Sequence, residues 1–165
     1  MNKETSVNLS ANRNVVVKTI ALVAHDREKK DLIEWVEFNW GTLAPHKLIC
    51  TGTTGRFVEE ALIRKGLRPD VAKLKSGPLG GDAELASLIA QGEIDYLFFF
   101  WDPMEPQPHD VDVKALLRIA TLYNIPTAMN RATADFIISS PLFASAYKPQ
   151  AKDYSSYLER TIKGI

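Results

Sequence analysis

Residues 96–101 of this chain read YLFFFW, an apolar run with no alternating polar residues. A strand with one face in water alternates apolar and polar side chains, whereas a strand covered by helices on both faces is apolar throughout. The run is too short to cross a membrane, and its length suits a strand better than a helix. It therefore predicts a buried strand in the middle of a parallel sheet.

The segments on both sides of this run repeat one pattern, an aliphatic stretch followed by apolar residues at helical spacing. The clearest helical set is Leu32, Ile33, Val36 and Trp40. The expected strands are 15–24, 47–50, 71–75, 96–101 and 126–129. The expected helices are one after residues 25–26, then 54–64, 82–91, 111–123, 132–138 and 153–163. This order predicts an α/β fold of Rossmann-like type, with three α/β/α layers, a five-stranded parallel sheet and right-handed crossovers.

The composition is that of a folded protein of one domain. With 165 residues, of which 45% are hydrophobic and 24% charged, the chain can bury a core and is not of the disordered class. We expect a disordered tail at 1–14 and a single domain at 15–165. Twenty basic and twenty acidic residues give no net field that favours nucleic acid or a membrane surface. No apolar run is long enough for a bilayer or a secretory signal, so we expect a cytoplasmic protein.

Polar segments follow four of the expected strands, at 25–26, 51–55, 76–82 and 102–112. In an open parallel sheet the carboxyl ends of the strands share one edge, and ligands bind outside that edge. The four segments are therefore expected to form one site for a small molecule.

The segment 51–55 reads TGTTG and resembles an anion cradle. Gly52 and Gly55 let the backbone approach a ligand, while Thr51, Thr53 and Thr54 add hydroxyl groups at a helix N-terminus whose amides attract phosphate. A plain threonine-rich helix cap fits this segment equally well.

Four further residues extend the expected anion site. Ser76 and Gly77 come from the neighbouring loop, and Lys29 follows His25 by four residues, so both can face the same edge. Taken singly, His25 and Lys29 fit exposed surface positions as well. Because these residues are expected beside the cradle at 51–55, a role in binding a phosphate group is favoured.

Asp82 ends the glycine-rich loop and begins a helix. A carboxylate beside an anion site suggests a general base, and the preceding Gly80 and Gly81 suit a place where a ligand comes close. The alternative is a simple N-cap, because aspartate accepts hydrogen bonds from the amides of a first turn.

His109 lies in a polar loop rather than on an apolar face, which favours a functional imidazole. Asp112, three residues later, could accept a hydrogen bond from one of its nitrogens and fix its orientation, or could simply stabilise the helix N-terminus. Asp102 ends the central strand, either as a further partner or as a turn residue.

Several chemistries find no support in the sequence. The single cysteine, Cys50, lies in an apolar run and is expected to be a buried thiol. The three histidines are dispersed, so no metal site is expected. The serine elbow G-x-S-x-G and the dinucleotide fingerprint G-x-G-x-x-G are both missing, so neither a serine hydrolase nor a nicotinamide cofactor is expected.

Together these segments closely resemble the methylglyoxal synthase family, in colinear order over residues 18–160. The matching segments are AHD at 24–26, TGTTG at 51–55, SGPLGGD at 76–82, FFWDP at 99–103, PHDVDVKALLR at 108–118 and NRATADF at 130–136. The resemblance implies a methylglyoxal-synthase-like fold and conversion of dihydroxyacetone phosphate to methylglyoxal and inorganic phosphate. It implies no metal or organic cofactor, a homohexamer, and inorganic phosphate as product and candidate inhibitor.

The resemblance also implies roles for single residues. Asp82 matches the family's catalytic base, His109 its imidazole at the substrate oxygens and Asp112 the acid that partners that imidazole. The positions that match substrate-binding residues are His25, Lys29, Thr51, Gly52, Thr53, Thr54, Ser76, Gly77 and His109. Arg160 lies close to, but not at, the position of the family's phosphate-contacting arginine.

Two other functions fit the same residues. Domains of this type also occur as regulatory modules of larger enzymes, which need the anion cradle but no base. A phosphosugar isomerase or a lyase for another substrate would keep both the base and the imidazole. Asp82, His109 and Asp112 occurring together favour the synthase.

Overall fold

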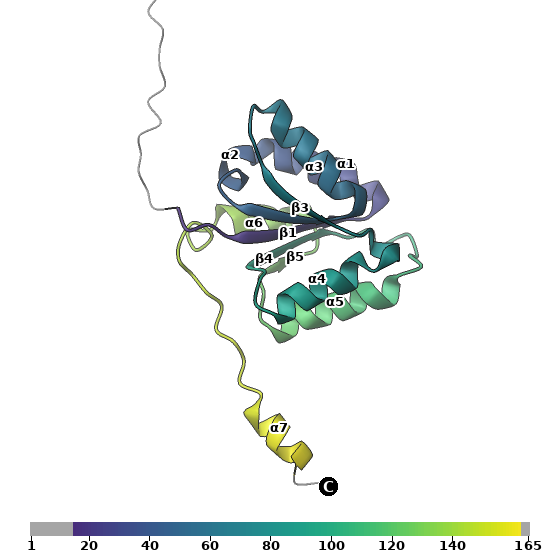
Figure 1. Ribbon diagram of the computed structural model, residues 1–165, viewed down its shortest axis with the longest axis vertical. Coiled ribbons are helices and arrows are strands. Elements are labelled where there is room, and N and C mark those ends of the chain that lie inside the picture. The colour runs from purple at the N-terminus through teal and green to yellow at the C-terminus, as the bar shows by residue number, and fades with distance from the viewer. Residues whose placement is uncertain (1–14, 163–165) are drawn as a thin grey trace, which may run out of the picture.

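The computed structural model describes residues 15–162 of the chain, so the tail expected at 1–14 lies outside the described residues. A five-stranded parallel sheet has the order β3-β2-β1-β4-β5. Helices cover both of its faces (Figure 1). The strands are β1 (Thr19–Ala24), β2 (Lys47–Thr51), β3 (Asp70–Leu74), β4 (Tyr96–Phe100) and β5 (Thr127–Ala128). The three-layer fold predicted from the sequence is confirmed.

The helices fall into two layers and a C-terminal arm. In Figure 1, α1 (Lys29–Phe38), α2 (Trp40–Leu43) and α3 (Gly52–Arg64) lie on one face of the sheet, and α4 (Gly81–Ala90) and α5 (Asp110–Leu122) on the other. The remaining helices are α6 (Arg131–Ser139) and α7 (Ser155–Ile162), with 3-10 turns η1 (Asp26–Glu28) and η2 (Gly77–Leu79). After α6 the chain still packs on the body through the buried Phe143, and it then extends away to α7, which lies apart from the sheet.

Strand β4 explains the apolar run. All five of its residues are buried: Phe98 and Phe100 belong to the core on the α1 side, and Leu97 and Phe99 to the core on the α4 side. Both faces of β4 are therefore buried, which is why its sequence does not alternate between apolar and polar residues. The central position, however, belongs to β1, because the chain crosses from β3 past β1 before adding β4.

Three expected strands are shorter than predicted, and the one expected at 96–101 lacks only Trp101. The first begins at Thr19 because β2 and β4 start opposite Thr19 and Ile20, so residues 15–17 have no neighbouring strand and are exposed. The last covers only Thr127–Ala128, which pair with Leu97 and Phe98. The sequence pattern marks β-forming residues but cannot show where a neighbouring strand ends.

Cys50 is buried, as expected, and burial raises its thiol pKa to about 12. A thiol that stays protonated at neutral pH is a poor nucleophile. Among the described residues no helix has the length and apolarity to cross a membrane.

Candidate active site

A cavity of about 240 Å³ opens at the carboxyl ends of the strands. This volume is below the roughly 300–1,000 Å³ of pockets for drug-sized ligands, so it suits a small metabolite. The predicted site residues that line it are His25, Lys29, Thr51, Gly52, Thr53, Thr54, Ser76, Gly77, Asp82 and His109. The structure thus brings together the predicted base, the predicted imidazole and every residue predicted to bind substrate, whereas Asp112, Asp102 and Gly55 do not line the cavity.

The cavity lies where the chain changes direction in the sheet. β1 connects towards β2 on one side, and β4 is added on the other, so the ends of β1 and β4 frame a crevice. The backbone amide of His25 donates to Phe100 O at 3.2 Å, and that of Asp102 donates to His25 Nδ1 at 3.1 Å. These bonds hold the ends of the two strands together.

Asp82 is a buried carboxylate rather than a helix cap. Gly80, with φ of 97°, is the N-cap of α4, so Asp82 lies inside the first turn. Its residue is 1% exposed, and its Oδ2 has no hydrogen-bond partner among the described residues. The nearest opposite group is His109 Nε2, at 3.5 Å. Burial raises the pKa of Asp82, so its carboxylate is a stronger base than an exposed one.

Gly77 keeps the space between these groups open. A Cβ at this position would lie 2.7 Å from His109 Nε2 and 3.0 Å from Asp82 Oδ2. Gly81 has a different role, since its Cβ would lie 2.0 Å from the carbonyl oxygen of Lys75. The expectation that the glycine before Asp82 makes room for a ligand is therefore wrong for Gly81, which instead makes room for its own loop.

His25 offers a hydrogen-bond donor to the cavity. Because its Nδ1 accepts from the Asp102 amide, the proton of its neutral form resides on Nε2. That Nε2 is buried and has no partner among the described residues. Burial and the nearby His109 lower the pKa of His25, which favours the neutral form. Asp102 therefore acts through its backbone, while its Oδ1 accepts from the Met104 amide in a turn at 2.9 Å.

The hydrogen bond expected between His109 and Asp112 does not form. Within the described part of the chain, His109 Nδ1 is buried without a partner, and Nε2 points to Asp82 instead. Asp112 is half-buried in the first turn of α5, where its amide donates to His109 O at 2.9 Å. Its charge contributes to the raised pKa of Asp82.

The end of the cavity away from Asp82 contains a positively charged side chain, that of Lys29. Lys29 Nζ donates to Thr53 Oγ1 at 2.7 Å and to Asp26 Oδ1 at 2.6 Å. Thr51 and Thr54 are buried beside them, and the first-turn amides of α3 have no acceptor within the helix. The arrangement can bind an anion.

The two cradle glycines serve different purposes. Gly52 has φ of 48°, and a Cβ there would lie 2.9 Å from the Cα and Cβ of Ser76, so the two loops touch at this point. The amide of Gly52 donates to Lys75 O at 3.1 Å and is thus occupied. The prediction that Gly55 approaches a ligand is wrong, because it is buried against Cys50 and Lys73 and does not line the cavity.

Two further polar residues line the cavity, Asp26 and Gln107, and both lie in segments expected to form the site, although neither was predicted individually as a site residue. Asp26 comes two residues after the end of β1, in a segment expected at the site, but the direction of its side chain depends on the 3-10 turn that it begins. Gln107 lies between two prolines in a loop whose path no periodicity predicts.

Comparison with known proteins supplies the family. A family model described as an MGS-like domain matches residues 31–129. A methylglyoxal synthase from Maridesulfovibrio salexigens is 52% identical over 88% of this chain and 98% of its own. One from Coxiella burnetii is 53% identical over 90% and 100%. The crystal structure of methylglyoxal synthase from Elizabethkingia anophelis superposes with a TM-score of 0.78 at 53% identity, covering 87% of this chain and 91% of that one. The resemblance drawn from the short motifs is confirmed, and this chain belongs to the methylglyoxal synthase family.

Proposed function

We propose that this chain converts dihydroxyacetone phosphate to methylglyoxal and inorganic phosphate, with Asp82 as the base that removes the substrate's proton. Family membership supports the overall reaction. The observation that carries the mechanism is the buried Asp82 carboxylate, 3.5 Å from His109 across a space that Gly77 leaves open. A regulatory domain would need the anion end of the cavity but not this arrangement.

In the first step Asp82 takes a proton from the carbon that bears the free hydroxyl group. The electrons of that C–H bond form a carbon–carbon double bond and leave negative charge on the carbonyl oxygen, which gives an enediolate. Donors aimed at the developing charge stabilise it more strongly in a water-excluded site than in solution. His25 Nε2–H and the imidazole of His109 are the donors in reach of this end of the cavity.

In the second step phosphate leaves from the carbon on the other side of the former carbonyl group. The hydroxyl proton is lost, its oxygen becomes the aldehyde carbonyl, the double bond shifts towards the carbon that loses phosphate, and the resulting enolate takes up a proton on that carbon to give methylglyoxal. Expulsion requires the breaking C–O bond to stand roughly perpendicular to the enediolate plane. An anion site that fixes the phosphate therefore selects elimination over isomerisation by orientation alone. The groups that fix the phosphate are Lys29, Thr53 and the first turn of α3.

The test is a product analysis. Purified protein is incubated with dihydroxyacetone phosphate, and methylglyoxal, phosphate and glyceraldehyde phosphate are quantified, with a no-protein sample and Asp82→Asn as controls. Equal amounts of methylglyoxal and phosphate are expected. Glyceraldehyde phosphate as the main product would indicate an isomerase. Phosphate binding without any product would indicate a regulatory module.

We also propose a cytoplasmic homohexamer. The arm that ends in α7 supports assembly, since Tyr157 and Leu158 are 69% and 63% exposed on a helix that stands apart from the body. Apolar surface of this kind is buried when subunits pack. Arg160, also on α7, does not line this chain's own cavity. Light scattering combined with gel filtration measures the mass, and a monomer would contradict this part of the proposal.

A further inference from the structure

We propose that Arg27 is a positioning residue for the reaction: its guanidinium joins the turn after β1 to the loop of residues 101–109 and so sets the spacing of His25 and His109. The inference rests on the proposed function, in which these two imidazoles are the donors to the developing enediolate. Arg27 does not line the cavity, so it acts only through the residues that it holds.

The ion pair of Arg27 connects the two segments that carry the imidazoles. Arg27 Nε lies 2.7 Å from Glu105 Oε2. Arg27 belongs to η1, for which His25 is the N-cap, and Glu105 precedes His109 by four residues in the loop after β4. The ring centroids of His25 and His109 lie 5.7 Å apart. A change in the gap between the two segments therefore changes the spacing of the imidazoles.

The loop of residues 101–109 needs such a restraint. Its prolines at 103, 106 and 108 have no backbone N–H to donate. The start of the loop is held by the Asp102 amide, which donates to His25 Nδ1 at 3.1 Å. Glu105 lies further along, and its ion pair with Arg27 restrains the loop between this first anchor and His109.

Arg27 reaches His25 by a second route, through Asp102. The Asp102 side chain is 5% exposed, and its Oδ2 is buried without a hydrogen-bond partner among the described residues. The Arg27 Nε lies 4.0 Å from this oxygen, and a buried carboxylate is unfavourable without an opposite charge. The amide of the same Asp102 keeps the proton of His25 on Nε2. Arg27 thus supports His25 through Asp102, and His109 through Glu105.

The expected effect is modest because the ion pair is partly in water. The side chains of Arg27 and Glu105 are 67% and 44% exposed, and exposed pairs contribute little. Loss of the pair should lower kcat by about two- to fivefold. The Kd of inorganic phosphate should not change, because Lys29 and Thr53 belong to α1 and α3 and not to the loop of residues 101–109.

The experiment compares Arg27→Met, Glu105→Gln and the double variant in steady-state kinetics with dihydroxyacetone phosphate, and measures the phosphate Kd of each by calorimetry. Each single substitution should lower kcat and kcat/KM together, as expected for a contribution made in the transition state. The double variant should be no slower than Arg27→Met, since both substitutions break the same pair. Arg27→Lys keeps the charge and should retain most of kcat, because the contact with Glu105 uses a single nitrogen.

Arg64→Met is the matched control. Arg64 Nη2 lies 2.7 Å from Glu37 Oε1, and the Arg64 side chain is 59% exposed, so this pair is similar in length and exposure. Arg64 ends α3, the helix whose first turn faces the cavity, and does not line the cavity itself. Its loss should leave kcat unchanged.

Four results would overturn the inference: a normal kcat in Arg27→Met, additive losses in the double variant, an equal loss in Arg64→Met, or a weaker phosphate Kd that accounts for the loss of activity. Each of these leaves the proposed function standing, because the wild type still forms methylglyoxal in the same assay. A wild type that forms no methylglyoxal would overturn the proposed function and this inference together.

Discussion

The two ends of the cavity differ sharply in their contact with water. Asp82 and His109 are 1% and 9% exposed, whereas the side chain of Asp26 at the other end is 92% exposed. Charge interactions are stronger away from water, which suits a proton transfer. Contacts near water can be exchanged easily, which suits binding and release of an anion. We therefore assign proton transfer to the buried end of the cavity and phosphate binding to the exposed end.

The largest effect is expected at the buried end. Asp82→Asn keeps the shape of the side chain but cannot accept a proton, so kcat should fall by about a hundredfold or more. Steady-state kinetics with dihydroxyacetone phosphate measures this change. Retention of more than about a tenth of kcat, a loss below roughly 1.4 kcal/mol, would show that Asp82 is not the base.

Gly77→Ala tests whether the gap between Asp82 and His109 is needed. The added methyl group would lie 2.7 Å from His109 Nε2, so it occupies the space in which the reacting carbon is proposed to sit. We expect kcat/KM to fall by about tenfold or more, a barrier increase of at least roughly 1.4 kcal/mol. Gly41→Ala, in α2 with open space around the position, controls for the loss of a glycine, and its kcat/KM should not change. A Gly77→Ala enzyme with normal kcat/KM would place the substrate elsewhere.

Thr53→Ala probes the exposed end. Loss of one hydrogen bond to a charged group costs roughly 1.5–3 kcal/mol, so KM should rise by about tenfold or more. A looser phosphate should also let some enediolate take its proton back, which appears as glyceraldehyde phosphate or as solvent deuterium in the substrate. Thr53→Ser keeps the hydroxyl group and should behave like the wild type. If KM and the product ratio of Thr53→Ala are unchanged, residues 51–55 are only a helix cap and not the phosphate site.

The smallest expected effect is on protein stability, and it differs between substitutions at the two ends of the cavity. Because burial raises the pKa of Asp82, its ionised form is disfavoured by folding, and the stability it contributes below its ordinary pKa is lost as pH rises. Asp82→Asn should therefore raise Tm at pH 7, and a gain of about 1 kcal/mol corresponds to about 2–4 °C. Asp26→Asn should not raise Tm, since the pKa of Asp26 is lowered. Calorimetry that found Asp82→Asn less stable would contradict this view of the buried end.

The sequence predicted the place of the site well because parallel strands force their carboxyl ends to one edge. Thr51 and Ser76 could be assigned to the cavity from their positions after strands alone. Contacts between side chains were harder to predict. His109 faces Asp82 rather than Asp112 because the loop of residues 101–109 turns its imidazole towards α4, and no helical spacing encodes that turn.

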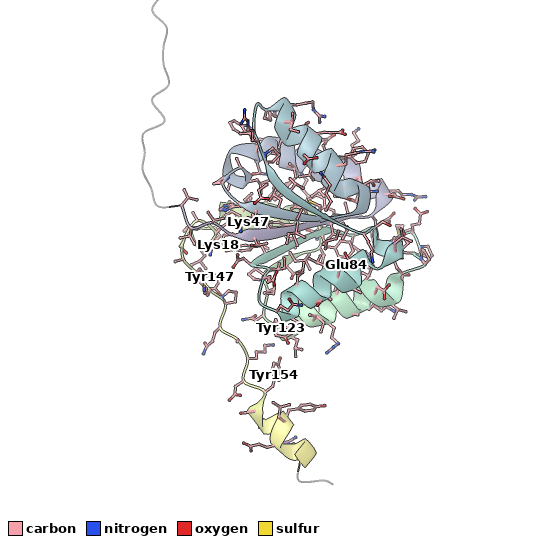
Figure 2. All side chains as sticks on the ribbon, viewed as in Figure 1. Lys18, Lys47, Glu84, Tyr123, Tyr147 and Tyr154 are labelled. Atoms are coloured by element: carbon pink, nitrogen blue, oxygen red, sulfur yellow. The ribbon has the colours of Figure 1, made fainter. Side chains whose placement is uncertain are left out.

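The same limit applies to the loops before the helices. Gly80 adopts a left-handed conformation and becomes the N-cap, which places Asp82 two residues beyond the cap position, inside the first turn. Asp26 points to Lys29 through a 3-10 turn of three residues that gives no periodic signal. Figure 2 shows side chains filling both sides of the sheet, and the packing of these side chains, rather than any motif, sets such directions.

The most direct test of the account is hydrogen exchange measured together with binding in Asp82→Asn. The protein is incubated with dihydroxyacetone phosphate in deuterium oxide, the substrate is followed by proton NMR, and the Kd of inorganic phosphate is measured on the same sample of protein. The account predicts no detectable exchange of the hydrogens next to the ketone and a phosphate Kd close to that of the wild type. Exchange at a rate comparable to wild-type turnover, or loss of phosphate binding, would contradict the division of the cavity into a reacting end and a holding end.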